Sequence, residues 1–348
     1  MNKILKEDIE QIIDRREVDF KALSGKSIFI SGATGLIGSN LVGVLLKANE
    51  LLVEPIHVIA MVRSIEKAES LFGKDSNIEY FLGDVSKPIC YEGEIDYIVH
   101  AASQTSSKAF VEDPVGVINI AFTGTTNALN LAREKQVKGM VYLSTMEVYG
   151  YPETEDKIYE NHGTNLNTMQ VRTSYPESKR MCETLCTAYA SQYGVPVKVM
   201  RLTQTFGPGV RYGDGRVFAE FARCAIEKRN IVLHTKGDTK RNYLYTADAV
   251  SAIITVLLKG NTGEAYNAAN EDTFCSIKEM AELVCKECAD NKIRVDLQLD
   301  SQKSYGYAPT LLLNLDTSKL RRLGWKAHYT LDEMFKRLCN SMKEELNS

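Results

Sequence analysis

The sequence predicts an α/β fold in which a doubly wound parallel sheet precedes a smaller C-terminal α/β region. Short apolar runs that are typical of buried strands alternate with helical stretches over the first two hundred residues. A glycine-rich turn joins the first apolar run to the first long helix, and the regular alternation ends near residue 203. Apolar strands of this kind are buried on both faces, so we expect helices on both sides of the sheet.

Composition excludes several classes of protein. The chain has 348 residues, of which 44% are apolar and 25% charged, with a net charge of −3, so a large core is available and a nucleic-acid-binding charge excess is absent. Residues 1–20 are charged throughout, unlike a signal peptide, and no apolar run approaches the ~20 residues that span a bilayer. The 8 cysteines stand at scattered spacings that suit a reducing compartment. We expect a cytoplasmic protein that binds neither nucleic acid nor membranes.

Three regions follow one another along the chain. Residues 1–24 are expected to form an amphipathic helical extension, packed on the main body or on a partner subunit, because isoleucines and a leucine recur at helical spacing. Residues 25–202 are expected to form a dinucleotide-binding domain. Its strands are predicted at 27–30, 57–62, 80–82, 97–100, 140–144 and 197–202, and its main helices at 36–48, 116–134 and 175–193. Residues 203–348 are expected to bind mainly substrate, with a helix near 247–259 returning to the sheet.

The turn after the first strand has the pattern Gly32-x-x-Gly35-x-x-Gly38. Glycines permit a tight turn and let the backbone approach a pyrophosphate, while the helix that follows offers unpaired N–H groups. The strand before and the helix after supply the required context, which makes the fold Rossmann-type. Further residues expected at the dinucleotide lie in this turn and at the ends of the third and fourth strands: Thr34, Leu36, Ile37, Asp84, Val85, Ala101 and Ala102.

The end of the second strand bears on which dinucleotide binds. An acid there would accept the ribose hydroxyls of NAD, whereas an arginine suits the 2′-phosphate of NADP. The segment 57–64 has no acid at its end and carries Arg63 instead. Arg63 could equally be a solvated cation or stack on the adenine, so the cofactor is expected to be NAD or NADP.

A tyrosine and a lysine share one face of a predicted helix. Tyr175 and Lys179 stand at i, i+4, and Pro176 suits the first helical turn. The lysine charge is expected to lower the phenol pKa, which is otherwise near 10. Thr145, at the end of an earlier strand, would complete the group with its hydroxyl. Such a group removes a proton from an alcohol while a nicotinamide accepts the hydride, so Tyr175 and Lys179 would also contact the cofactor; no metal site is expected.

Together these motifs resemble the extended short-chain dehydrogenase/reductase superfamily, in its NAD-dependent epimerase/dehydratase branch, over about residues 25–335. The resemblance rests on the glycine turn, Asp84, residues 144–150 and residues 175–179. It implies an enzyme that acts on a nucleotide-linked sugar, with Thr145, Tyr175 and Lys179 in the catalytic positions. It also implies a homodimer formed through the helices at 116–134 and 175–193.

Within this branch the sequence is most similar to the UDP-glucuronate decarboxylases. This similarity is carried by residues 144–150, 172–180, 205–208, 214–217 and 241–245. It implies oxidation of sugar C4 to a transient 4-ketone, followed by loss of the C5 carboxylate as carbon dioxide. In that reaction Glu147 and Arg241 would deliver a proton and place the carboxylate.

The chain departs from the decarboxylase pattern at three places. Met146 stands where decarboxylases have serine and 4,6-dehydratases have aspartate, Gln204 replaces an asparagine that contacts substrate, and 304–309 lacks the expected arginine. Met146 cannot donate a proton, which disfavours dehydration. A nucleotide-sugar 4-epimerase and a net NADP(H)-dependent 4-keto-sugar reductase or dehydrogenase stay open as alternatives, as does a non-catalytic dinucleotide sensor. Gln204, Arg216 and Arg241 are the expected substrate contacts, since arginine forks match phosphate oxygens.

Overall fold

The computed structural model describes residues 2–106, 108–299 and 310–347. Seven parallel strands form the main sheet: β1 (Ser27–Ser31), β2 (His57–Val62), β3 (Ile78–Leu82), β4 (Tyr97–His100), β5 (Gly139–Thr145), β7 (Val197–Leu202) and β11 (Ala265–Ala268). Their order is β11-β7-β5-β4-β1-β2-β3. After β3 the chain crosses to the other side of β1, so a crevice for ligands is expected where the carboxyl ends of β1 and β4 meet. The predicted fold class is confirmed.

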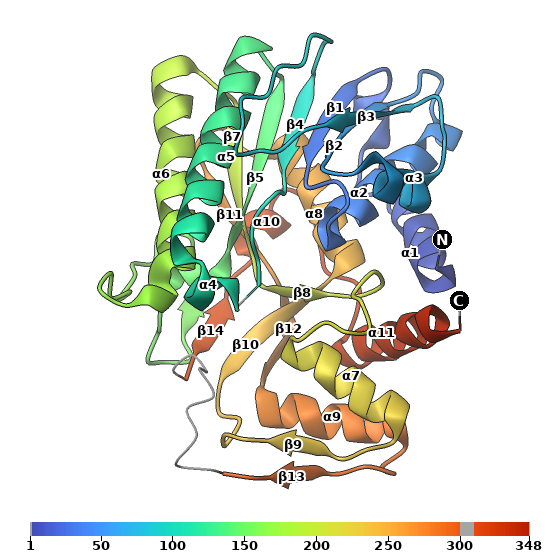
Figure 1. Ribbon diagram of the computed structural model, residues 1–348, viewed down its shortest axis with the longest axis vertical. Helices are drawn as coiled ribbons and strands as arrows, with labels where there is room; N and C mark the ends of the chain where they lie inside the picture. The colour runs from blue at the N-terminus through green and yellow to red at the C-terminus, as the bar shows by residue number, and fades with distance from the viewer. Residues whose placement is uncertain (1, 107, 300–309, 348) are drawn as a thin grey trace.

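Helices cover both faces of this sheet (Figure 1). Side chains of β1 alternate between two cores, as strand geometry requires. Phe29 packs into the cluster under α5 (Pro114–Glu134) and α6 (Ser174–Tyr193). Ile28 and Ile30 pack into the cluster under α2 (Leu36–Ala48) and α8 (Thr246–Lys259). Burial on both sides explains why the strands are continuous apolar runs.

A smaller lobe lies below the carboxyl ends of the main sheet (Figure 1). This lobe contains the second sheet of the molecule, with the strand order β12-β10-β14-β6 and with β8 also paired to β10. A separate two-stranded sheet is formed by β13 and β9. The strands are β6 (Lys157–Ile158), β8 (Gln204–Phe206), β9 (Ile231–Leu233), β10 (Lys240–Tyr245), β12 (Asn270–Ser276), β13 (Val295–Leu297) and β14 (Leu312–Leu315). Besides α1, which is described below, the other α-helices of the described chain are α3 (Ile65–Phe72), α4 (Ala109–Glu112), α7 (Val217–Glu227), α9 (Ile277–Ala289), α10 (Ser318–Arg321) and α11 (Leu331–Leu346).

The two lobes exchange strands. β11 comes from the C-terminal part of the chain but pairs with β7 at the edge of the main sheet. β6 comes from the earlier part and pairs with β14 in the second sheet. The sequence did not predict β11, because Ala265–Ala268 is short and carries an asparagine in place of an apolar run. A boundary near residue 203 therefore divides the chain less cleanly than its sequence pattern suggests.

The N-terminal helix α1 (Lys3–Ile13) packs on its own chain, against α2, α8 and α11. It ends at Ile13, well short of residue 20. Ile9 and Ile12 are buried in the main core. The buried carboxylate of Asp8 accepts a hydrogen bond from Tyr245 at 2.6 Å and lies 2.6 Å from the Arg337 guanidinium. None of the described helices is both long and apolar enough to cross a bilayer.

This packing makes α1 a contributor to stability. Ile12 is 1% exposed, so replacing it with alanine leaves a cavity and is expected to lower the free energy of unfolding by about 2–5 kcal/mol. Leu51, which is 62% exposed, provides the control. Leu51→Ala is expected to change the free energy of unfolding by less than about 0.5 kcal/mol. Urea unfolding measures both values. Equal stability of the two variants would mean that α1 does not belong to the folded core.

Candidate active site

The glycine turn is packed against the end of β4. Gly32 has φ +72°, and a Cβ there would lie 2.7 Å from the backbone nitrogen of Ala102. A Cβ on Gly38 would lie 2.2 Å from the carbonyl oxygen of Gly32. Gly35 is the N-cap of α2 and supplies no side-chain cap, so the first N–H groups of that helix are left for another acceptor. The turn therefore has the close backbone packing and free N–H groups that a pyrophosphate would require.

The other residues expected at a dinucleotide lie along the same edge of the sheet. Leu36 and Ile37 form the first turn of α2, and the Thr34 carbonyl accepts a hydrogen bond from Lys67 at 3.3 Å. Asp84 follows β3; its carboxylate accepts the Ser86 N–H at 2.8 Å, and this bond holds its pKa below the usual value.

Two further contacts fix the crevice walls. The carbonyl of Val85 accepts a hydrogen bond from Asn127 of α5 at 2.8 Å, which ties the segment after β3 to that helix. Ala101 and Ala102 follow β4, and Ala101 donates its N–H to Ser31 at the end of β1. A nicotinamide dinucleotide laid across this edge would have backbone groups and small side chains on both sides.

Tyr175 lies in the first turn of α6, 8% exposed. Its ring stacks on Phe110 of α4, with centroids 4.2 Å apart and planes 9° from parallel. Burial and the charge of Glu147 raise the pKa of the phenol above its usual value, while a hydrogen bond with Thr145 acts in the opposite direction. Thr145 at the end of β5 and Tyr175 thus meet, as predicted.

The expected effect of Lys179 on the phenol is wrong for this structure. The pKa of Tyr175 is raised, because burial outweighs every favourable interaction. Lys179 donates its ammonium to the carbonyl of Leu143 at 2.7 Å and lies 4.8 Å over the Tyr142 ring. Burial lowers the pKa of Lys179 to about 8. The ammonium is therefore tied to β5 through the Leu143 carbonyl.

His100 lies beneath this group and is structural. Its Nδ1 lies 2.6 Å from the hydroxyl of Ser31, and its ring stacks on Tyr142. Burial, and then the charge of Lys179, lower the pKa of His100 to about 3. The buried imidazole, bonded to Ser31, thus joins β4 to β1.

An ion pair lies beside Tyr175. Glu147, in the turn after β5, forms an ion pair with Arg172, with Oε2 and Nη2 2.9 Å apart. The Arg172 guanidinium also lies 4.9 Å from the centre of the Phe110 ring. Sequence reasoning did not assign Arg172 and Phe110 to the site. Arg172 lies three residues before Tyr175 in the matching motif, whereas nothing in the pattern around Phe110 marks it.

Met146 occupies the position that would need a proton donor for dehydration. Its side chain is buried, and the sulfur accepts a hydrogen bond from the Thr203 hydroxyl at 3.2 Å. A thioether has no proton to give.

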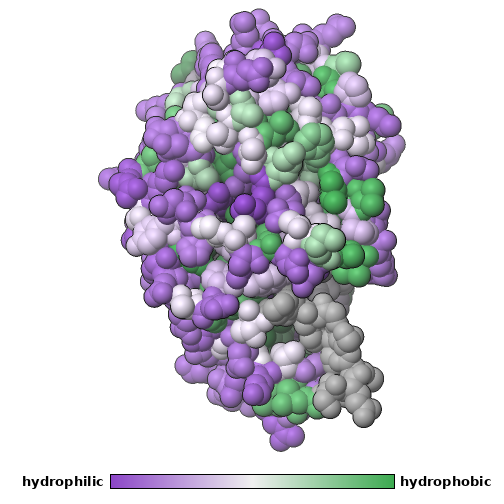
Figure 2. All heavy atoms as spheres, turned by 90° about the vertical axis from the view of Figure 1, so that its left-hand side faces the viewer, coloured by the Kyte–Doolittle hydropathy of each residue, from purple (hydrophilic) through white to green (hydrophobic). Residues whose placement is uncertain are grey.

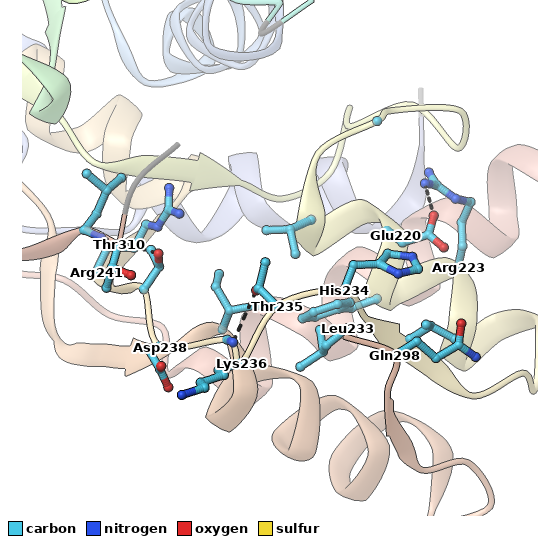
Figure 3. Close-up of a pocket in the computed structure, with 18 of the residues that line it drawn as sticks. Glu220, Arg223, Leu233, His234, Thr235, Lys236, Asp238, Arg241, Gln298 and Thr310 are labelled. Carbon is cyan, nitrogen blue, oxygen red and sulfur yellow. Dashed lines mark hydrogen bonds and ion pairs between the residues drawn. The ribbon is translucent and has the colours of Figure 1, made fainter. Parts of the chain in front are cut away.

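A cavity of about 930 Å³ opens in the smaller lobe (Figure 3). Arg241 of β10 lines it near Thr310, and His234 and Arg223 lie toward its other end. The Nε atom of Arg241 is buried and has no hydrogen-bond partner among the described residues, so an anion in this cavity would satisfy it.

The other two expected substrate residues lie nearby with different surroundings. Gln204 of β8 pairs with Tyr243 of β10, two residues from Arg241. Arg216 forms a two-point ion pair with Asp214, at 3.0 and 2.6 Å, and stacks on Phe218. It is not among the residues that line the cavity, although its neighbours Gly215 and Val217 are. Across the described part of the chain, no group of three or more His, Cys, Asp or Glu side chains could hold a metal ion.

The chain is similar to known proteins in sequence and in fold. The model of the NAD dependent epimerase/dehydratase family matches residues 28–269. UDP-glucuronic acid decarboxylase 1 of Xenopus tropicalis is 30% identical over 290 residues, which cover 80% of this chain and 65% of that protein. The chain thus spans less than two thirds of that relative.

Solved structures share the fold at lower identity. UDP-glucose 4-epimerase of Thermotoga maritima, solved with UDP-glucose, has a TM-score of 0.76 and 20% identity over 92% of this chain and 99% of its own. dTDP-glucose 4,6-dehydratase of Bacillus anthracis, solved with NAD, has a TM-score of 0.73 and 20% identity over 92% and 98%. The resemblance noted in the sequence is confirmed: the chain belongs to the NAD dependent epimerase/dehydratase family of enzymes.

Proposed function

We propose that this protein oxidises C4 of a nucleotide-linked sugar to a transient 4-ketone, and that its substrate is UDP-glucuronate, which it decarboxylates. The observation that carries the proposal is the meeting of Tyr175 and Thr145, with the Glu147–Arg172 pair near Tyr175. The decarboxylase relatives and the 4-epimerase fold support a substrate of this class.

Each side chain has a distinct task in this reaction. A bound nicotinamide dinucleotide would accept a hydride from C4 and return it at the end of the cycle. Thr145 holds the C4 hydroxyl by a hydrogen bond, and Tyr175 takes its proton as hydride departs. The raised pKa of Tyr175 makes the phenol a strong base once it is ionised, and its burial against Phe110 excludes water. Lys179 is buried on the same face of α6 and brings a positive charge to the site.

The 4-ketone determines what happens at C5. With a carboxylate on C5, the 4-ketone is a β-keto acid. The bond between C5 and the carboxylate carbon therefore breaks with release of carbon dioxide, and its electron pair passes into an enolate whose oxygen is on C4. Glu147, held by Arg172, would pass a proton from water to C5, which restores the 4-ketone. Tyr175 returns its proton to the C4 oxygen as hydride is returned to C4. Met146 gives no proton for loss of the C6 hydroxyl, which argues against dehydration.

The cavity of the smaller lobe is suited to the nucleotide diphosphate. Arg241 lines this space, and its buried Nε has no hydrogen-bond partner among the described residues. A charged hydrogen bond from its guanidinium to phosphate is worth about 1.5–3 kcal/mol. Arg241→Ala is therefore expected to raise KM for the nucleotide sugar about 10- to 100-fold with little change in kcat. Arg294→Ala, which removes an exposed arginine paired with Asp296 in the same lobe, is the control. A change in kcat alone would contradict a binding role for Arg241.

Incubation with UDP-glucuronate, analysed by mass spectrometry of the nucleotide sugar, tests the proposal. Loss of the mass of carbon dioxide is the expected result. Unchanged mass with a new stereoisomer would favour a 4-epimerase, and stoichiometric consumption of NADPH would favour a net reductase. Loss of the mass of water would contradict the assignment based on Met146.

We also propose that two copies pair through α5 and α6. Figure 2 looks onto this side of the molecule, where apolar side chains lie among polar ones. Large exposed side chains gather here: Val115, Ile118 and Phe122 on α5, and Met181 on α6. Sedimentation analysis of Phe122→Asp is expected to show monomers where the native chain shows dimers. Leu51→Asp, with its exposed side chain on the short turn Asn49–Leu51, should stay dimeric. A native chain that sediments as a monomer would contradict the pairing.

A further inference from the structure

A row of polar side chains crosses three neighbouring strands of the main sheet near their carboxyl ends. Ser144 of β5 lies opposite Arg201 of β7, which lies opposite Asn267 of β11. Each of them is the last residue but one of its strand. Ser144 and Asn267 are buried, and buried polar side chains require hydrogen-bond partners. This polar row therefore has to be completed by groups from outside the three strands.

Glu183 of α6 completes the polar row at one end. Its carboxylate accepts a hydrogen bond from the Ser144 hydroxyl at 2.5 Å. It also receives a two-point contact from Arg201, whose Nε and Nη2 lie 3.0 and 2.6 Å from the two carboxylate oxygens. A two-point contact fixes direction as well as distance. The side chains of Glu183 and Arg201 are only 12% and 13% exposed, so a shift of α6 along the sheet would break bonds that water does not readily replace.

The same guanidinium is bonded to the turn that follows β5. The Nη1 atom of Arg201 donates to the Tyr149 hydroxyl at 2.9 Å. That hydroxyl donates in turn to the side-chain oxygen of Asn267 at 2.6 Å, which completes the polar row at its other end. Tyr149 ends the short turn that begins directly after Thr145 and carries Glu147. One arginine thus joins α6 to the segment that holds two of the proposed active-site residues.

Glu183 also places a negative charge one helical turn from Lys179. Burial lowers the pKa of Lys179 to about 8, and the charge of Glu183 acts in the opposite direction. The other groups that face this ammonium in the described structure are thiols, an aromatic ring, a backbone carbonyl and an imidazole: Cys182 and Cys186 on α6, Tyr142 and Leu143 on β5, and His100 on β4. Glu183 is the carboxylate of this set, so it favours the charged form of Lys179.

We propose that Glu183 is a positioning residue of the active site, because it fixes α6 at the carboxyl ends of β5 and β7. The fixed helix carries Tyr175 and Lys179, while Thr145 follows Ser144 directly on β5. The proposal rests on the proposed function, since it concerns the same phenol and hydroxyl. Glu183 lies about two helical turns beyond Tyr175, so it acts through α6. A displacement of about 1 Å between reacting groups can cost about 100-fold in rate, so loss of this anchor should lower kcat.

Steady-state turnover of UDP-glucuronate by Glu183→Gln tests this role. The variant keeps the size of the side chain and loses the charge that pairs with Arg201. Its kcat is expected to fall about 10- to 100-fold, while KM for the nucleotide sugar and calorimetric affinity for the dinucleotide stay within about twofold of the native values. Glu264→Gln is the matched control, because it removes the carboxylate of an ion pair with Lys319 just before β11, and it should turn over at the native rate. A rise in KM with native kcat would overturn the positioning role.

Ser144→Ala separates positioning from a loss of folding. Removal of one partner from a buried ion pair can destabilise a protein by itself. Ser144→Ala leaves the pair of Glu183 and Arg201 intact and removes only the hydrogen bond to β5. Its thermal unfolding should stay close to native, whereas kcat should fall about tenfold with KM unchanged. Native kcat in Ser144→Ala would overturn the proposal, even if Glu183→Gln does not fold.

Titration of Lys179 gives a readout that needs no substrate. In protein labelled with carbon-13 at the lysine Cε, the Lys179 signal is the one that is absent from Lys179→Arg. In Glu183→Gln the ammonium is expected to lose its proton below the native pKa of about 8, since the opposing carboxylate is gone, and Glu264→Gln should titrate like the native chain. An unchanged titration in folded Glu183→Gln would overturn the proposal. A native chain that is inactive towards UDP-glucuronate would overturn the proposed function, and this titration alone would then decide the role of Glu183.

Discussion

Tyr175→Phe is expected to lower kcat by about 10²- to 10⁴-fold, the usual contribution of a positioned acid–base group. The variant lacks only the phenolic oxygen, so the stacking of the ring on Phe110 and the fold of α6 are retained. Dinucleotide affinity should therefore change little. The measurement pairs steady-state turnover of the nucleotide sugar with calorimetric titration of the dinucleotide.

The same helix supplies the control. Tyr189 is partly exposed, and its hydroxyl donates to Asn130 at 2.7 Å on the surface of α5. Tyr189→Phe is expected to turn over at the native rate. If Tyr175→Phe were as active as this control, the phenol could not be the base, and a binding protein of the same fold would become the better explanation.

Gly38→Ala is expected to weaken dinucleotide binding about 10- to 100-fold. The added Cβ would stand 2.2 Å from the carbonyl oxygen of Gly32, and the backbone of both residues is held by β1 and α2. Relief of this clash must widen the turn that holds the pyrophosphate, and such overpacking costs about 1–3 kcal/mol. Titration with dinucleotide measures the loss, and thermal unfolding shows whether the fold has changed as well.

Gly163→Ala is the matched substitution for this test. A Cβ at Gly163 meets nothing within 4 Å, so binding and stability are expected to stay at native values. Native affinity in Gly38→Ala would show that the turn does not hold the dinucleotide.

The main sheet was predictable because its strands are buried on both faces. Phe29 between Ile28 and Ile30 gives an unbroken apolar run, although these side chains enter different cores. β11 was missed since it is short and lies at the edge of the sheet, where its sequence carries Asn267. Tertiary pairing with β7, which comes from far earlier in the chain, is what makes it a strand.

The sequence was enough to predict which residue types form the site. It was not enough to predict how those residues are buried and paired. Spacing placed Tyr175 and Lys179 on one face of α6, and the structure agrees. Burial is a property of the packed fold, however, so the sequence could not show that it raises the pKa of Tyr175. Phe110 reaches Tyr175 from another helix, and the ion pair of Glu147 likewise depends on long-range packing.

Removal of hydride from sugar C4 is the central claim, and rapid mixing with C4-deuterated UDP-glucuronate tests it most directly. The account predicts transient absorbance of reduced nicotinamide, a primary deuterium isotope effect on its appearance, and product that carries the deuterium at C4 again. Both signals should vanish in Tyr175→Phe. Product formed without reduced nicotinamide and without an isotope effect would contradict the account.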